Sequence, residues 1–150
     1  ILIPLDGSPF AEQILTHERI LALRGCQTRI TLLRVVPYRH LTTIEYSAGV
    51  MLEDCMATAK TDARWYLEAI AEGMQVQDFL VSVEVRVGNA TEEILDVAQT
   101  HQVDMIAMAT HGRKGVQRWL LGSVTQEVLQ TTTVPILVIR PQDREEAMQN

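Results

Sequence analysis

Apolar runs with strand character alternate with segments of helical period along almost the whole chain. Five runs are rich in Val, Ile, Leu and Ala: "ILIPLD" (1–6), "RITLLRVV" (29–36), "LVSVEVRVG" (80–88), "VDMIAMA" (103–109) and "VPILVIR" (134–140). Between them, apolar residues recur every three or four positions, as on one face of a helix. Parallel strands need such crossovers, which are right-handed. The alternation therefore predicts an α/β fold with a doubly wound, five-stranded parallel sheet and helices on both faces.

Capping residues predict where several helices begin. Asn89 with Glu92, and Ser123 with Gln126, have the spacing of a capping box. A long helix with one apolar face is expected over residues 51–73.

The first helix and the third strand carry further signals. Ser8 followed by Pro9 predicts a helix start, and apolar spacing carries that helix to Ala22, before a stop at Gly25. The segment 80–88 alternates apolar and polar residues, which is typical of a half-exposed strand at the edge of a sheet.

Composition restricts the kinds of partner. The 150-residue chain has 13 Lys plus Arg against 19 Asp plus Glu, a net charge of -6, which disfavours broad binding to nucleic acid or to a membrane surface. No apolar run has the length of a transmembrane helix. Cys26 and Cys55 fit reduced thiols in the cytoplasm. The length fits one domain, residues 1–141, with a polar tail at 142–150.

Two loops that follow predicted strands contain residues suited to binding a ligand. In an open parallel sheet, ligands bind beyond the carboxyl ends of the strands, where the strand order reverses. Asp6 follows the first strand, where it can form a turn or contact a ligand, and we favour the ligand role. The stretch "ATHGRKGVQRWLLGS" (109–123) follows the fourth strand. The longest irregular connection, 38–50, is expected to cover the site.

The stretch 109–123 has the ingredients of a phosphate site. Glycine lets the backbone approach a phosphate, and the helix that begins near Gly122 and Ser123 presents amides and a positive dipole end. An equally supported reading is that Ser123 only caps its helix and that the glycines only turn the chain. The fingerprints GxxxxGK[ST] and GxGxxG are absent, which disfavours a Walker-type NTPase and a dinucleotide enzyme. The histidines and cysteines share no metal-ligand spacing, so no metal site is expected.

The spacing of this stretch resembles a family motif. Ala109, "TH", Gly112, the nine residues "RKGVQRWLL" and then Gly122-Ser123 are similar to Gly-x2-Gly-x9-Gly-Ser/Thr, which is found in nucleotide-binding members of the universal stress protein family. "ILIPLDGS", "LLRV" and "VGNATEEILDVAQTHQVDMIAMATHGR" are similar to the family's flanking segments, so the resemblance covers residues 1–140.

The resemblance implies a Rossmann-like, adenine nucleotide alpha-hydrolase-like domain that binds ATP or AMP, with Mg²⁺ able to enter alongside the phosphates. It implies that Asp6 contacts the ribose or adenine side and that the backbone of Val35 contacts the adenine edge. Ala109 would lie near the ribose, with the phosphates held by the later residues of the motif. The full set expected to contact the nucleotide is Pro4, Leu5, Asp6, Val35, Ala109, His111, Gly112, Arg113, Gly122, Ser123, Val124 and Thr125.

Two positions depart from the family pattern. Ala109 replaces the first glycine of the motif, and its methyl group adds bulk beside the sugar and disfavours a positive φ. Arg34 stands where a histidine is common, and a side chain at this point of a strand can simply point to solvent.

The resemblance implies a nucleotide-binding stress-response protein that acts as a ligand-gated regulatory or interaction module and dimerises through the strand at 134–140. The apolar edge of that strand independently favours pairing with a second copy. No general base is recognised, so catalysis is limited to weak ATP hydrolysis at most. A nucleotide-free dimerisation module of the same fold is the alternative. A catalytic adenylate-forming or ATP-pyrophosphatase relative is disfavoured, since neither HIGH nor SGGxDS occurs.

Overall fold

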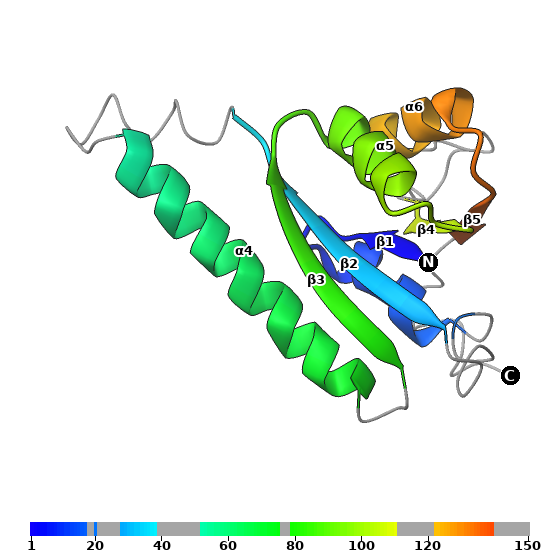
Figure 1. The fold of residues 1–150 in the computed structure, drawn as a ribbon, viewed down its shortest axis with the longest axis horizontal. Helices are drawn as coiled ribbons and strands as arrows, with labels where there is room; N and C mark the ends of the chain where they lie inside the picture. Colours follow the sequence, from blue (N-terminus) through cyan, green and yellow to red (C-terminus); the bar gives the residue numbers. More distant parts are fainter. Residues whose placement is uncertain (18–19, 21–27, 39–51, 76–78, 111–121, 140–150) are drawn as a thin grey trace, which may run out of the picture.

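A five-stranded parallel sheet forms the centre of the molecule (Figure 1). The computed structural model describes residues 1–17, 20, 28–38, 52–75, 79–110 and 122–139. The strands are β1 (Leu2–Pro4), β2 (Arg29–Val36), β3 (Leu80–Val87), β4 (Ile106–Ala109) and β5 (Ile136–Ile139). They lie in the order β3-β2-β1-β4-β5, so the order reverses between β1 and β4. The predicted doubly wound sheet is confirmed.

Helices cover both faces of this sheet, and each face has its own apolar core. One face is covered by α1 (Pro9–Glu12), the 3-10 turn η1 (Gln13–Thr16) and α4 (Leu52–Gln75), and the other by α5 (Ala90–Thr100) and α6 (Ser123–Thr131) (Figure 1). Leu32 of β2 packs with Leu67 of α4 on the first face. Its neighbour Leu33 packs with Ile94 and Val128 on the second, because successive strand residues point to opposite faces.

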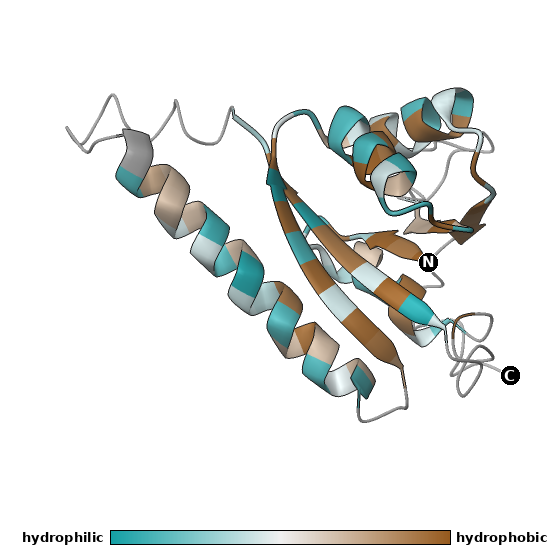
Figure 2. Ribbon diagram, viewed as in Figure 1, coloured by the Kyte–Doolittle hydropathy of each residue, from teal (hydrophilic) through white to brown (hydrophobic). Residues whose placement is uncertain are grey.

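The position of a strand in the sheet explains its sequence pattern. β2 lies inside the sheet with both faces covered, so its apolar residues pack in both cores, Ile30 and Leu32 in one and Leu33 and Val35 in the other; Figure 2 shows polar positions between them. β3 is an edge strand, as its alternation predicts. Its residues Val81, Val83 and Val85 pack on the core beneath α4, while Ser82 and Glu84 occupy the alternate positions.

The first helix is shorter than its apolar spacing predicts. α1 passes into η1 after Glu12, and His17 is extended, with φ of -69° and ψ of 135°. The Thr16 hydroxyl donates to the Gln13 carbonyl at 3.2 Å, and the His17 amide bonds to Ile14 instead, at 3.3 Å. The carbonyl that would continue an α-helix is therefore engaged by a side chain. The predicted stop at Gly25 lies outside the described residues.

Two of the three predicted N-caps are confirmed, and the third is wrong. The Ser8 hydroxyl accepts from the Ala11 amide at 3.2 Å, and the Asn89 side chain accepts from Thr91 at 2.9 Å. In α6, however, Gly122 occupies the N-cap and Ser123 is the first helical residue, with no side-chain capping bond. Ser123 lies one position too far into the helix for its hydroxyl to act as the cap.

Some expectations fall on residues that the structure does not describe. The polar tail at 142–150 and almost all of the connection at 38–50 are among them. Within the described part of the chain, none of the helices has the combination of length and apolar character needed to span a bilayer. Of the two cysteines, Cys55 is described, as a half-buried free thiol on α4.

Two alanine substitutions test the assignment of the N-caps. Asn89→Ala removes an acceptor for two amides of α5, from Thr91 and Glu92, and is expected to lower the free energy of unfolding by about 1 kcal/mol. Ser123→Ala removes no capping bond and is expected to cost less than about 0.5 kcal/mol. Urea unfolding of both variants measures the difference. Equal losses would contradict the assignment of Gly122 as the N-cap.

Candidate functional site

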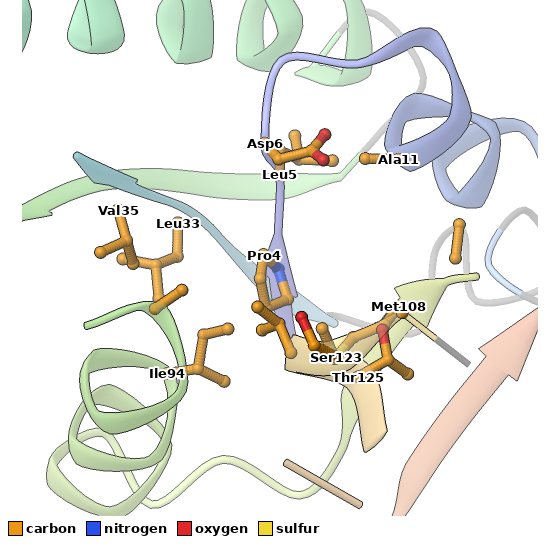
Figure 3. Close-up of a pocket in the computed structure, with 14 residues that line it drawn as sticks. Pro4, Leu5, Asp6, Ala11, Leu33, Val35, Ile94, Met108, Ser123 and Thr125 are labelled. Atoms are coloured by element: carbon orange, nitrogen blue, oxygen red, sulfur yellow. The ribbon is translucent and has the colours of Figure 1, made fainter. Parts of the chain in front are cut away.

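A cavity of about 270 Å³ lies at the carboxyl ends of the central strands, beside the point where the strand order reverses (Figure 3). Its walls come from β1, β2 and β4, the loop after β1, α1, and the N-terminal parts of α5 and α6. The predicted site residues that line it are Pro4, Leu5, Asp6, Val35, Ala109, Gly122, Ser123, Val124 and Thr125. The structure thus brings together residues that are more than a hundred positions apart in the sequence.

Three predicted site residues are not described by the structure, and five residues of the lining were not predicted. His111, Gly112 and Arg113 lie outside the described residues. The sequence pattern did not single out several apolar residues of the lining, which are Ala11, Leu33, Ala90, Ile94 and Met108. One of these was accessible to prediction: Leu33 must share the face of Val35, since the two are separated by a single strand residue. The others look like ordinary core positions in the sequence.

The cavity opens where β1 and β4 stop pairing. β1 is in register with β2 over all three of its residues, but with β4 only at Leu2, opposite Ile106. The Leu2 amide bonds to the Met105 carbonyl at 2.9 Å, so the next bond that β1 would donate to β4 needs an N–H at residue 4. Residue 4 is proline, which has none. The missing bond leaves the carboxyl ends of these two strands free to separate.

The loop after β1 places a carboxylate at the cavity. Asp6 lines the cavity, and its Oδ1 accepts from the Ser8 amide at 2.9 Å, which closes a tight turn. Gly7 between them has φ of +79°, a left-handed conformation that favours glycine. Asp6 therefore forms the turn expected of it and also lines the cavity, where contact with a ligand stays a prediction.

The first turn of α6 forms the other polar part of the wall. Gly122, Ser123, Val124 and Thr125 all line the cavity there. The first amides of a helix have no partner within it, and the helix dipole makes this end positive. Ser123 is exposed, and its hydroxyl is not used as a cap. This end of the cavity is suited to an anion.

Ala109 does not have the backbone conflict expected of it. It is the last residue of β4, in register with Ile139 of β5. Among the described residues other than glycine, Gln102 is the one with a positive φ, so Ala109 needs no left-handed conformation. Its effect on the site is limited to the bulk of a methyl group in the wall.

Arg34 also differs from expectation, because it does not simply point to solvent. Its side chain is on the face of β2 opposite the cavity, where the guanidinium carbon lies 5.8 Å from the centroid of the Tyr66 ring. Its Nη1 donates to the Leu5 carbonyl at 3.2 Å. The Tyr66 hydroxyl donates in turn to Glu12 of α1 at 2.9 Å. These contacts connect β2 and α4 with the segment that follows β1.

The environment of Tyr66 keeps its hydroxyl protonated. Burial raises its pKa most, and the hydrogen bond and negative charge of Glu12 raise it further. The negative charge of Asp6 adds to the rise, while the Arg34 cation opposes it. Tyr66 therefore remains a donor to Glu12 across the physiological range.

The raised pKa predicts how stability depends on pH. A tyrosine whose pKa is higher in the folded state contributes stability that is present below the ordinary tyrosine pKa of about 10 and is lost as the pH rises above it. Denaturant unfolding between neutral and strongly alkaline pH is expected to show this fall, and Tyr66→Phe to reduce it. Tyr38→Phe, at an exposed position, serves as the control. An unchanged fall in Tyr66→Phe would contradict the assignment.

Comparisons with known proteins agree with this architecture. A model of the universal stress protein family matches residues 1–140. Universal stress protein MJ0577 of Methanocaldococcus jannaschii is 27% identical, over 93% of each chain. The structure of MJ0577 matches with a TM-score of 0.76 and 28% identity, over 95% of each chain. Universal stress protein Slr1230 of Synechocystis is 34% identical over 93% of this chain, which spans 42% of that relative.

More distant structures share the fold and were solved with ligands. One is a universal stress protein family protein from Arabidopsis thaliana with AMP bound, with a TM-score of 0.64 and 14% identity, over 97% of this chain and 92% of the other. Another is a universal stress protein in complex with cAMP, with a TM-score of 0.62 and 12% identity, over 93% and 94%. From the family model and the close agreement in fold, the chain belongs to the universal stress protein family.

Proposed function

We propose that the cavity binds an adenine nucleotide, ATP or AMP, and that the bound nucleotide regulates a surface through which the protein acts in a stress response. The observation that carries this proposal is the meeting of three chemistries in one cavity. An apolar wall, a carboxylate and a helix N-terminus lie around it. These match the base, the sugar hydroxyls and the phosphates of a nucleotide.

The apolar wall suits a purine ring. Leu33 and Val35 of β2 and Ile94 of α5 supply aliphatic surface there. A backbone contact at Val35 would recognise the adenine edge, because that edge has both a donor and an acceptor. The Asp6 carboxylate would accept from ribose hydroxyls. Ala109 would lie beside the sugar, with Pro4 and Leu5 completing this side of the wall.

The phosphates would lie at the first turn of α6. The amides of Ser123, Val124 and Thr125, the Ser123 hydroxyl and the close approach allowed by Gly122 would hold them. None of the described lining residues is a lysine or arginine, and Asp6 adds negative charge. A Mg²⁺ ion that enters with the phosphates, together with Arg113 of the preceding segment, would balance the charge, and His111 and Gly112 would contact the phosphates. The AMP and cAMP complexes of the more distant relatives support this class of ligand.

Binding rather than catalysis is the proposed activity. Among the described lining residues, Asp6 is the one carboxylate and there is no histidine, and Asp6 is engaged by the Ser8 amide. Hydrolysis of ATP would be weak at most. A nucleotide that binds one state of the segment 109–123 better than another would shift the population of those states, which is enough for a ligand-gated switch in the cytoplasm. The alternative is a nucleotide-free module in which the same loop has a structural role.

Pairing of two copies through β5 is part of the proposal. β5 lies at one edge of the sheet, and Ile136, Leu137 and Val138 are only half buried. An apolar edge strand of this kind needs a cover, and a second copy of the same strand provides one.

Calorimetric titration with ATP, AMP and GTP tests the nucleotide proposal. The chain is expected to bind the adenine nucleotides selectively, and Gly122→Val to weaken binding by more than about tenfold, since bulk at the N-cap keeps phosphate away from the amides. Among the described residues, no atom lies within 4 Å of a Cβ added at Gly122, so that added atom causes no clash there.

Gly73→Val is the matched control for this titration. In the described part of the chain its added Cβ also meets no atom within 4 Å, but the residue lies near the end of α4 and outside the cavity lining. It is expected to bind nucleotide like the unchanged chain. No heat change and no thermal shift with any nucleotide would leave the nucleotide-free module as the better proposal.

Sedimentation over a range of protein concentrations tests the pairing. We expect a species of twice the mass of one chain, because the edge of β5 gains backbone hydrogen bonds and apolar contacts when it pairs. A strict monomer at high protein concentration would contradict the proposed dimer.

A further inference from the structure

Arg34 lies behind the site rather than in it. Along β2, Leu33 and Val35 line the cavity, and the side chain between them points to the other face of the sheet. There the guanidinium is 5.8 Å from the ring centroid of Tyr66, which is within the range of a cation–π contact. A nucleotide in the cavity would therefore lie on the opposite side of the sheet from this cation.

The guanidinium contacts both residues that flank Asp6. On one side, Nη1 donates to the carbonyl of Leu5 at 3.2 Å. On the other, a Cβ added at Gly7 would lie 3.0 Å from Nη1 and 3.2 Å from Nη2, so the guanidinium packs directly against the backbone of this glycine. The turn that carries Asp6 thus rests on the side chain of Arg34.

Tyr66 connects Arg34 to two helices. Tyr66 of α4 holds the guanidinium with its ring and donates its hydroxyl to Glu12 of α1 at 2.9 Å. Since α1 follows the Asp6 turn directly, the turn is fixed at both of its ends. The charged groups that act on Tyr66 are Glu12, Arg34 and Asp6, so this cluster is itself electrostatically coupled.

We propose that Arg34 is a positioning residue, which holds the turn at residues 5–7 so that the Asp6 carboxylate is aimed at the sugar of the nucleotide. The nucleotide part of this inference rests on the proposed function. Arg34 acts through the backbone of the turn from the far face of the sheet, without touching the ligand. The planar fork of arginine is needed for this, because one nitrogen bonds Leu5 while the plane packs on Gly7 and Tyr66. A lysine ammonium is a point charge and would restore little of it.

Double-substitution analysis with AMP as the ligand tests the route from Arg34 to the sugar. Arg34→Met in the unchanged background is expected to weaken AMP binding by about threefold to tenfold, and Arg34→Lys by nearly as much. In the Asp6→Ala background the same change is expected to have less than about a twofold effect, since the carboxylate that Arg34 positions is gone. Arg86→Met is the matched control: Arg86 lies on β3, paired with Glu84 and outside the cavity lining.

Amide hydrogen exchange of the free protein provides a second readout. The Ser8 amide donates to Asp6 at 2.9 Å, so its protection reports the order of the turn without any ligand. Arg34→Met is expected to speed exchange at Ser8 while the Thr91 amide of α5, capped by Asn89, stays unchanged. Faster exchange at both sites would mean a general loss of structure and would overturn the inference.

The outcomes separate this inference from the proposed function. If the unchanged chain binds AMP and Arg34→Met keeps both full affinity and Ser8 protection, the positioning role is wrong and the proposed function stands. Equal losses of affinity with and without Asp6 would also overturn it. If the unchanged chain does not bind AMP, the proposed function fails, and the exchange at Ser8 alone decides whether Arg34 holds the turn.

Discussion

The site depends on one interrupted ladder in the middle of the sheet. β1 lies between β2 and β4, and it keeps its pairing with β2 to the end while its pairing with β4 stops after Leu2. Pro4 is compatible with this position because its missing N–H faces the side on which the ladder has already ended. Proline inside a central strand usually weakens a sheet. Here the proline lies at the reversal of strand order, where ligands bind between the carboxyl ends of the strands.

Most of the fold was predictable from the sequence because strand-like apolar runs alternate with segments of helical spacing along the chain. The strands inside the sheet are mostly apolar, with Arg34 of β2 as an exception, and β3 alternates because it lies at an edge. The errors lie at helix ends. The chain becomes extended at His17 and the first helix ends before it, and Gly122 rather than Ser123 takes the N-cap of α6. The first change shortens a helix and the second moves an N-cap by one residue, and neither alters the topology.

The polar residues of the candidate site could be predicted from the sequence, but most of its apolar residues could not. Spacing found the polar and glycine-rich parts of the wall, since Asp6 and Gly122-Ser123 are unusual residues at strand and helix ends. The apolar parts, such as Ile94 and Met108, have the same composition as the core and become recognisable only when the strands are aligned. The environment of Arg34 depends on Tyr66, which is far away in sequence. No local pattern could have predicted that contact.

The two edges of the sheet differ in a way that bears on self-assembly. β3 is eight residues long and carries Glu84, whose Oε1 lies 2.6 Å from Nε of Arg86 and whose Oε2 lies 3.1 Å from Nε2 of His101. β5 is four residues long and wholly apolar. An association through β5 uses the same surface on both copies and leaves a β3 edge at each end of the combined sheet. Because β3 carries Glu84 and Arg86, continued edge-to-edge addition into a fibre is disfavoured there.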